Sequence, residues 1–217
     1  MDSVNVKPGG VFLWAGGYFG ILLLCAFLDV AVWRKLFPGQ AHILSLATET
    51  VSFLGFVLLL GRSGFPLRPL EGFSLWGAAL ALFCAGFFFL ALDKGLDPLL
   101  DRLFPQSSQG YEESLSGLRA HPVTGMLRVC LLAPAMEELL TRGILLGGLR
   151  EAWGWPLALA VSAGVFALLH FNLVQTLSAL VCGLVLGLLY LCTGSLLCCF
   201  LAHAAYNLIS MFFCMGA

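Results

Sequence analysis

Charged residues are scarce in this chain. Asp, Glu, Lys and Arg make up only 11% of its 217 residues, whereas a soluble domain carries about 25%. Hydrophobic residues make up 60%, so the composition excludes an ordinary soluble domain and predicts an integral membrane protein. The net charge is −1 and no basic stripe is present, so nothing indicates a nucleic-acid partner.

The eight cysteines form no CxxC pair and show no spacing typical of a zinc site or a disulfide framework. They lie in or beside apolar runs, and we interpret them as small buried apolar residues. A cleavable signal peptide is not expected either. The start, MDSVNVKPGG, has no clearly basic region, and the apolar run after it is too long. We expect this run to be retained as a first membrane span.

Long apolar runs fill most of the chain. A helix needs about 20 mostly apolar residues to cross a bilayer, because lipid offers the backbone no hydrogen-bond partner. The sequence therefore predicts an all-α, polytopic membrane bundle of about seven transmembrane helices. The expected spans are 11–33, 41–61, 74–92, 122–149, 154–170, 172–192 and 195–215. We expect the long fourth span to be tilted, or broken near Pro134.

One polar segment, 93–121, divides the chain. We expect a single integral membrane domain over 1–217, with three N-terminal spans in 1–92, this polar connector, and a four-span catalytic core in 122–217. Within the connector, LDPLLDRLF predicts a short amphipathic helix in the interface, and PQSSQGYEES an exposed loop. Lys and Arg are nearly balanced on the two sides of the spans, so the positive-inside rule assigns no orientation.

Small residues recur at intervals of four in the C-terminal part of the chain. The pairs are Gly143 with Gly147, Ala179 with Gly183, and Gly183 with Gly187. This spacing lets helix backbones approach closely in lipid. It predicts tight packing of the last four spans, which a polar site needs to exclude lipid.

Polar groups at membrane depth are costly and are functional-site hypotheses by default. Few occur in the four C-terminal spans. They are Glu137, Glu138 and Arg142 in the fourth span, His170 at the end of the fifth, and His203 and Asn207 in the seventh.

Helical geometry separates the two glutamates. Glu138 and Arg142 are four residues apart and share a face, in the order that favours an ion pair. Glu137 points about 100° away from that face. We therefore predict that Glu138 is the paired, structural carboxylate. Glu137 is left free, as a general base requires.

The other polar residues form two further patterns. His203 and Asn207 share a helix face, and together they can donate hydrogen bonds to an oxyanion. Phe166 and His170 also share a face, and an imidazole there can act on a water beside a glutamate.

Each of these patterns alone has a structural alternative. The acid–base pair can be a clasp, His170 can satisfy a buried carbonyl or lie at an interface, and His203 and Asn207 can bridge helices. We interpret Asp29 and Glu49, in the first two spans, as cavity-lining or interfacial.

Taken together, the three patterns resemble the signature motifs of one family. Glu137-Glu138-x-x-x-Arg142, Phe166-x-x-x-His170 and His203-x-x-x-Asn207 are similar, in order and helical setting, to those of the CAAX protease and bacteriocin-processing (CPBP, or ABI) intramembrane endopeptidases. The resemblance covers about residues 122–217, and the first three spans carry no assigned motif.

The resemblance implies a glutamic-type intramembrane protease, with Glu137 and His170 activating the attacking water. It implies that His203 and Asn207 stabilise the oxyanion, while Glu138 and Arg142 support the site. Some accounts of the family invoke a metal, and a Glu/His/His set can bind zinc. Because the sequence has no HExxH or similar ligand spacing, we expect no metal and no other cofactor.

Family members process CAAX proteins, bacteriocins or C-terminal sorting signals. We favour a membrane-anchored protein or peptide substrate with a membrane-held C-terminal tail, such as a sorting signal. We expect a multi-pass protein of the bacterial inner membrane, in contact with the lipid bilayer. The sequence does not define the oligomeric state. Two alternatives stay open: a non-catalytic regulator or scaffold with the same fold, and a proton-coupled transporter, which the lack of a convincing inverted repeat disfavours.

Overall fold

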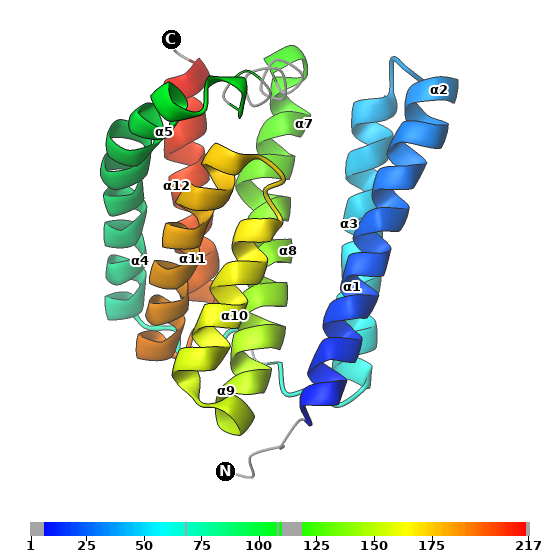
Figure 1. The fold of residues 1–217 in the computed structure, drawn as a ribbon. Coiled ribbons are helices and arrows are strands. Elements are labelled where there is room, and N and C mark those ends of the chain that lie inside the picture. Colours follow the sequence, from blue (N-terminus) through cyan, green and yellow to red (C-terminus); the bar gives the residue numbers. More distant parts are fainter. Residues whose placement is uncertain (1–6, 68, 108, 110–118, 216–217) are drawn as a thin grey trace. The chain divides into compact units, whose positions relative to one another are not determined.

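The computed structural model describes residues 7–67, 69–107, 109 and 119–215. The described secondary structure is helical, with no strand among these residues, so the predicted all-α class is confirmed. The chain forms two compact units, Met1–Leu67 and Arg68–Ala217. Figure 1 shows the helices of each unit.

The first unit is a pair of long helices. A continuous helix comprises α1 (Pro8–Leu28), the π-helical η1 (Asp29–Trp33) and α2 (Arg34–Leu36), and α3 (Ala41–Arg62) follows it. Tyr18 of α1 packs edge-on against Phe56 of α3, with ring centroids 5.0 Å apart. The Asp29 carboxylate accepts hydrogen bonds from Arg34 and from Ser45 of α3. Asp29 therefore joins the two helices of this unit.

The second unit begins with a helix that extends beyond the predicted third span. It comprises α4 (Leu75–Phe88), η2 (Phe89–Leu96) and α5 (Asp97–Leu103). The Ser74 side chain caps α4 by accepting a hydrogen bond from the Gly77 amide at 3.0 Å. Residues of the expected amphipathic segment are indeed helical, but they continue this long helix. Of the expected loop after it, 108 and 110–114 lie outside the described residues.

A second long helix carries the first motif. It comprises α7 (Pro122–Met126), η3 (Leu127–Leu132), α8 (Ala133–Glu138), η4 (Leu139–Leu146) and α9 (Gly147–Trp153). The helix does not break at Pro134, which was one of the two expectations. Proline removes a backbone donor and crowds the preceding turn. The wider π-helical turns of η3, directly before α8, accommodate both effects without a break.

Three more helices complete the unit: α10 (Trp155–Leu168), α11 (Leu173–Thr193) and α12 (Leu196–Met215). Gly154 separates α9 from α10 with φ +75°, and Gly194 ends α11 in the left-handed conformation with φ +66°. Glycine adopts these angles without steric cost. Both turns are short, so consecutive helices lie against each other (Figure 1).

One hydrophobic core cluster of the second unit is built from α4, η2, α10, α11 and α12. Its largest fully buried members include Phe88, Phe166 and Leu186. At Gly183, an added Cβ would lie 3.2 Å from Ala163 Cα and from Phe166 Cδ1. The close helix approach predicted from the small residues at this position is confirmed. It brings α11 directly against α10, the helix that precedes His170.

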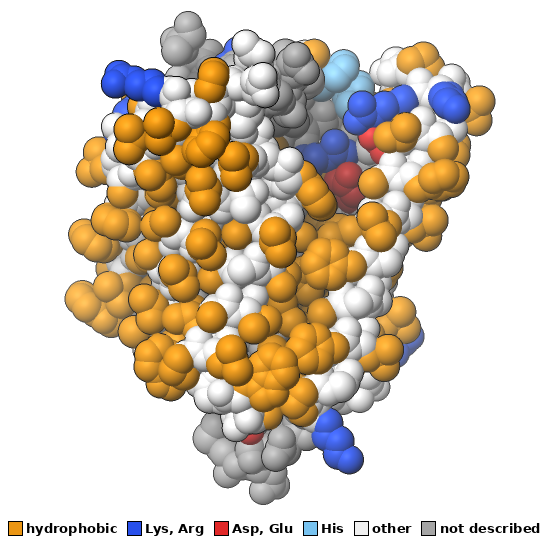
Figure 2. Space-filling view, in the orientation of Figure 1, with side chains coloured by type: hydrophobic (Ala, Val, Ile, Leu, Met, Phe, Trp, Pro, Cys, Tyr) orange, Lys and Arg blue, Asp and Glu red, His pale blue; other side chains and the backbone are white. Residues whose placement is uncertain are grey.

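Five helices among the described residues are long and apolar enough to span a membrane. They are Pro8–Leu36, Ala41–Arg62, Leu75–Leu103, Leu173–Thr193 and Leu196–Phe213. The predicted number of seven is not confirmed. The helix over 122–153 carries Glu137, Glu138 and Arg142, and α10 has only 14 residues. On the face in Figure 2, hydrophobic side chains cover the lengths of the helices, as expected for surfaces in contact with lipid.

Candidate active site

Glu138, the last residue of α8, lies at the centre of a buried polar cluster in the second unit. Its side chain is 1% exposed. Its Oε1 accepts hydrogen bonds from Arg142 Nη1 at 3.0 Å and from His203 Nδ1 at 2.9 Å. The Arg142 ion pair expected from the sequence spacing is therefore confirmed. The bond from His203 was not expected, and it joins α8 to α12.

Arg142 is fully buried and makes contacts on several sides. Besides Glu138, Nη1 donates to Thr141 Oγ1 at 2.8 Å, and Nη2 donates to the Gly183 carbonyl of α11 at 2.8 Å. The guanidinium carbon lies 4.5 Å from the centre of the Phe166 ring, a cation–π contact. A buried guanidinium is tolerated only when it is paired and hydrogen-bonded in this way. Arg142 thus links the motif helix to both α10 and α11.

Glu137 has a different environment from its neighbour. Its side chain is 22% exposed, and its Oε2 lies 4.0 Å from His203 Nε2. This buried oxygen has no hydrogen-bond partner among the residues that the structure describes. The backbone of this turn is held by Thr141 Oγ1, which donates to the Glu137 carbonyl at 2.6 Å. The carboxylate therefore has acceptor capacity left for a water or a substrate group.

Phe166 connects the two histidines. Its ring centroid lies 5.2 Å from that of His170 and 5.4 Å from that of His203. The Phe166 carbonyl also lies 3.0 Å from His170 Nδ1. Because a carbonyl only accepts, Nδ1 carries the hydrogen, and a neutral His170 has its lone pair on Nε2. The described contacts link His170 to the buried cluster through Phe166.

Asn207, one turn after His203 on α12, contacts the motif helix. Its Nδ2 donates to the Val129 carbonyl of η3 at 2.9 Å. This acceptor fixes the orientation of the amide, since only the NH₂ group can donate. The second N–H of the same NH₂ group is not used in that bond. Asn207 thus lies on α12 with one donor available, on the helix face shared with His203.

The structure brings five of the six predicted residues onto one connected set of contacts. Glu138 pairs with Arg142 and His203, and His203 lies 4.0 Å from Glu137. His170 joins this set through Phe166. Asn207 is the sixth predicted residue. It lies one turn after His203 on α12, and its amide donates to the Val129 carbonyl of η3. The spacing of motifs along helices predicted which residues share a face. It did not predict that Glu138 accepts from His203, because that bond depends on how α8 and α12 pack.

Sequence patterns also missed several polar partners. Ser162 of α10 donates to the Thr141 carbonyl at 2.7 Å. Tyr206 of α12 donates to the Asp93 carboxylate of η2 at 2.6 Å, and Ser178 of α11 donates to Asp97. Hydroxyls are common and carry no motif, so nothing in the sequence singled them out. Asp93 and Asp97, four residues apart at the start of the polar segment 93–121 and therefore on one helix face, are the signal that was available.

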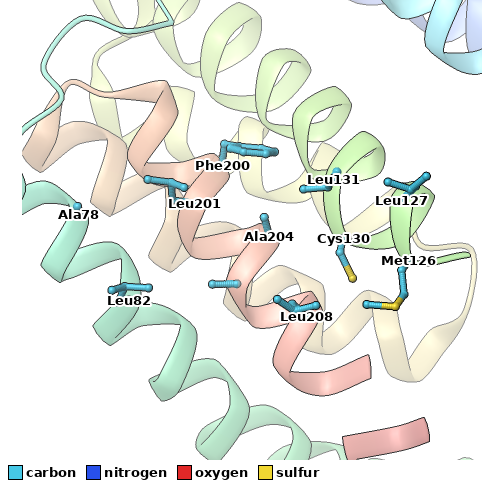
Figure 3. A pocket seen from close by; sticks show the side chains of 11 residues that line it. Ala78, Leu82, Met126, Leu127, Cys130, Leu131, Phe200, Leu201, Ala204 and Leu208 are labelled. Carbon is cyan, nitrogen blue, oxygen red and sulfur yellow. The ribbon is translucent and has the colours of Figure 1, made fainter. Parts of the chain in front are cut away.

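An apolar pocket with a volume of about 550 Å³ lies beside α12 (Figure 3). Ala78 and Leu82 of α4, Cys130 and Leu131 of η3, and Ala204 and Leu208 of α12 line it together with other apolar side chains. Ala204 and Leu208 each follow a predicted site residue by one position. The pocket and the polar cluster therefore lie on adjacent faces of α12. The pocket provides an apolar surface next to the helix that carries His203.

Among the described residues, no three His, Cys, Asp or Glu side chains are grouped so as to hold a metal ion. His203 Nδ1, one of the nitrogens that a metal would need, already bonds Glu138. The expectation that no metal takes part stays a prediction.

The apolar helices and the buried polar cluster together define a multi-pass integral membrane protein. Residues 119–209, which hold all three motifs, match the family model described as type II CAAX prenyl endopeptidase Rce1-like. The predicted resemblance to the CAAX protease family is thereby confirmed. The match supports CAAX-type intramembrane protease activity in general. No curated protein and no solved structure matches the chain.

Proposed function

We propose that the protein is a glutamic-type intramembrane endopeptidase that cuts a peptide bond near the membrane-held C-terminal tail of a protein substrate. One observation carries this proposal. Glu138 is 1% exposed and its Oε1 already accepts hydrogen bonds from Arg142 and His203, whereas Glu137 is 22% exposed. The buried Oε2 of each glutamate has no hydrogen-bond partner in the described structure. A buried acceptor left unpaired is costly. Of the two glutamates, Glu137 is the one whose side chain is partly exposed, so its unpaired oxygen is the better place for the attacking water.

Glu137 and His170 activate that water in the proposed mechanism. The carboxylate of Glu137 accepts one proton of the water as it attacks the scissile carbonyl. His170 presents Nε2 as a second acceptor, because its Nδ1–H is directed at the Phe166 carbonyl. The proton taken up by Glu137 then passes to the leaving amine, so that water and peptide give one carboxylic acid and one amine. The acid then ionises and its proton passes to the amine, which leaves as an ammonium ion. General acid–base assistance of this kind contributes about 10²–10⁴-fold in rate.

His203 and Asn207 stabilise the oxyanion in the same mechanism. This role requires a hydrogen on each ring nitrogen of His203: Nδ1–H donates to Glu138, and Nε2–H lies on the side where Glu137 lies. Asn207 offers its second N–H while the first remains bonded to the Val129 carbonyl. Preorganised donors are commonly the largest electrostatic contribution to catalysis.

The proposed substrate is a membrane-anchored protein or peptide, cut at a CAAX-type end or at a C-terminal sorting signal. A tail held in lipid can bring its scissile bond to the depth of Glu137 without crossing bulk water. The apolar pocket beside α12 offers a surface for such a tail (Figure 3). We place the protein in the bacterial inner membrane.

The proposal is tested with the full chain in lipid nanodiscs and two substrates: a prenylated CAAX peptide and a reporter with a C-terminal transmembrane tail. We expect cleavage of at least one. The Glu137→Gln variant should lose at least about 100-fold in kcat. Glu151→Gln, an exposed glutamate on the same helix, is the matched control and should cut like wild type. Cleavage of neither substrate, or full activity in Glu137→Gln, contradicts the proposal.

A further inference from the structure

The short connection between α10 and α11 carries His170. α10 ends at Leu168 and α11 begins at Leu173. Phe171, next to His170, has φ +32° and a side chain that is 93% exposed. A bulky residue adopts such a left-handed angle only under strain, and the strain persists where surrounding contacts impose it. Contacts with residues outside the His170 connection therefore impose its conformation.

Ser107, which lies 65 residues before Asn172 in the sequence, makes these contacts. Its hydroxyl donates to Asn172 Oδ1 at 2.7 Å and accepts from the Val174 amide at 3.2 Å. Its carbonyl accepts from Asn172 Nδ2 at 2.6 Å. We name these three hydrogen bonds the Ser107 clasp. They involve both the side chain and the backbone of Ser107, and they engage the first residues of α11.

The clasp is accompanied by a helix cap and by a further hydrogen bond between the Asp97–Ser107 segment and α11. Asn172 Oδ1 also accepts from the Gln175 amide at 3.3 Å, so the same side chain caps α11. One and a half turns further along α11, Ser178 donates to Asp97 of α5. The segment from Asp97 to Ser107 is thus bonded to the N-terminal half of α11 at both of its ends. Movement of either partner disturbs the connection that carries His170.

We propose that the Ser107 clasp positions His170 for water activation, which makes Ser107 and Asn172 positioning residues of the peptidase. This inference rests on the proposed function. The His170 ring is fixed at Nδ1 by the Phe166 carbonyl and at its face by the Phe166 ring. The clasp fixes the backbone two residues later. Without it, Phe171 relaxes from its left-handed angle, and Nε2 of His170 is displaced.

The test compares Ser107→Ala, which removes the hydroxyl, with Ser107→Thr, which keeps one. The substrate is whichever of the two above the wild type cuts. We expect Ser107→Ala to lower kcat by at least about tenfold at unchanged KM, because small misplacement of a catalytic group is costly. Ser107→Thr should restore most of the rate. Thr124→Ala removes an exposed hydroxyl that bonds the His121 carbonyl and, as the matched control, should have no effect.

Asn172→Asp provides a second variant. It keeps the acceptor for the cap and for the Ser107 hydroxyl but loses the donor to the Ser107 carbonyl. It should lower kcat in the same direction as Ser107→Ala. If Ser107→Ala does not fold, this variant decides the outcome.

Amide hydrogen exchange at Val174 is the second readout, and it does not depend on activity. Loss of the clasp should raise exchange at this amide in Ser107→Ala but not in Thr124→Ala. Unchanged exchange shows that the clasp does not form and overturns the inference. Raised exchange with unchanged kcat, or an effect on KM alone, overturns the positioning role while the proposed function stands. A wild type that cuts neither substrate overturns the proposed function, and the inference with it.

Discussion

Glu137 and Glu138 are adjacent and chemically identical, yet their surroundings differ completely. Glu138 is enclosed, and its Oε1 is bonded to Arg142 and His203, whereas the side chain of Glu137 is 22% exposed and lies 4.0 Å from His203 Nε2. The 100° rotation between neighbours on a helix produces this difference. It directs one carboxylate into the packed cluster and the other toward the side on which the proposed water lies.

Removing both partners of the buried ion pair should cost less stability than the sum of removing each one alone. Glu138→Met leaves Arg142 buried without its carboxylate, which costs about 3–5 kcal/mol of unfolding free energy. The double variant with Arg142→Met should cost less than the sum of the two single variants. Thermal and denaturant unfolding in detergent measure this. Additive losses would show that the two side chains do not stabilise each other.

At the scale of single residues, the sequence predicted side-chain pairs within one helix but did not predict the hydrogen bonds between helices. The Glu138–Arg142 pair follows from their spacing alone. The bonds from His203 to Glu138 and from Arg142 to the Gly183 carbonyl cross between helices. They depend on helix rotation and packing distance, which periodicity does not determine.

Among the elements, the motif helix is notable for its π-helical turns. η3 and η4 flank α8, the short segment that ends in the two glutamates. Every residue of η4 is buried. π-helical turns are often found at functional sites. Their wider geometry also allows the helix to pass Pro134 unbroken, a result that a rule based on proline alone does not predict.

The contact between α10 and α11 gives a prediction for Gly183. Gly183→Ala places a methyl group against the Ala163 backbone and the Phe166 ring. We expect a loss of about 1–3 kcal/mol of stability and lower activity, because Phe166 contacts Arg142 and both histidines. Gly164→Ala on α10, where an added Cβ meets nothing within 4 Å, is the control. Equal behaviour of the two variants in unfolding and cleavage assays would contradict the packing described here.

For the whole molecule, composition predicted the class and missed the lengths of the spans. A chain with 60% hydrophobic residues folds as helices with apolar surfaces (Figure 2). The helix α4–η2–α5 runs past the predicted boundary, since Asp93 and Asp97 are bonded to Tyr206 and Ser178 and do not end it. A hydropathy pattern treats such residues as polar and therefore places the boundary too early.

The most direct test of the central claim compares the C-termini of membrane-anchored proteins in cells that express the wild type or Glu137→Gln. Terminal mass spectrometry should detect new, shortened C-termini with the wild type. They should be absent with Glu137→Gln, although that variant is inserted in the membrane at the same level. Identical C-termini in both samples would contradict a Glu137-dependent peptidase and favour a non-catalytic membrane protein with the same fold.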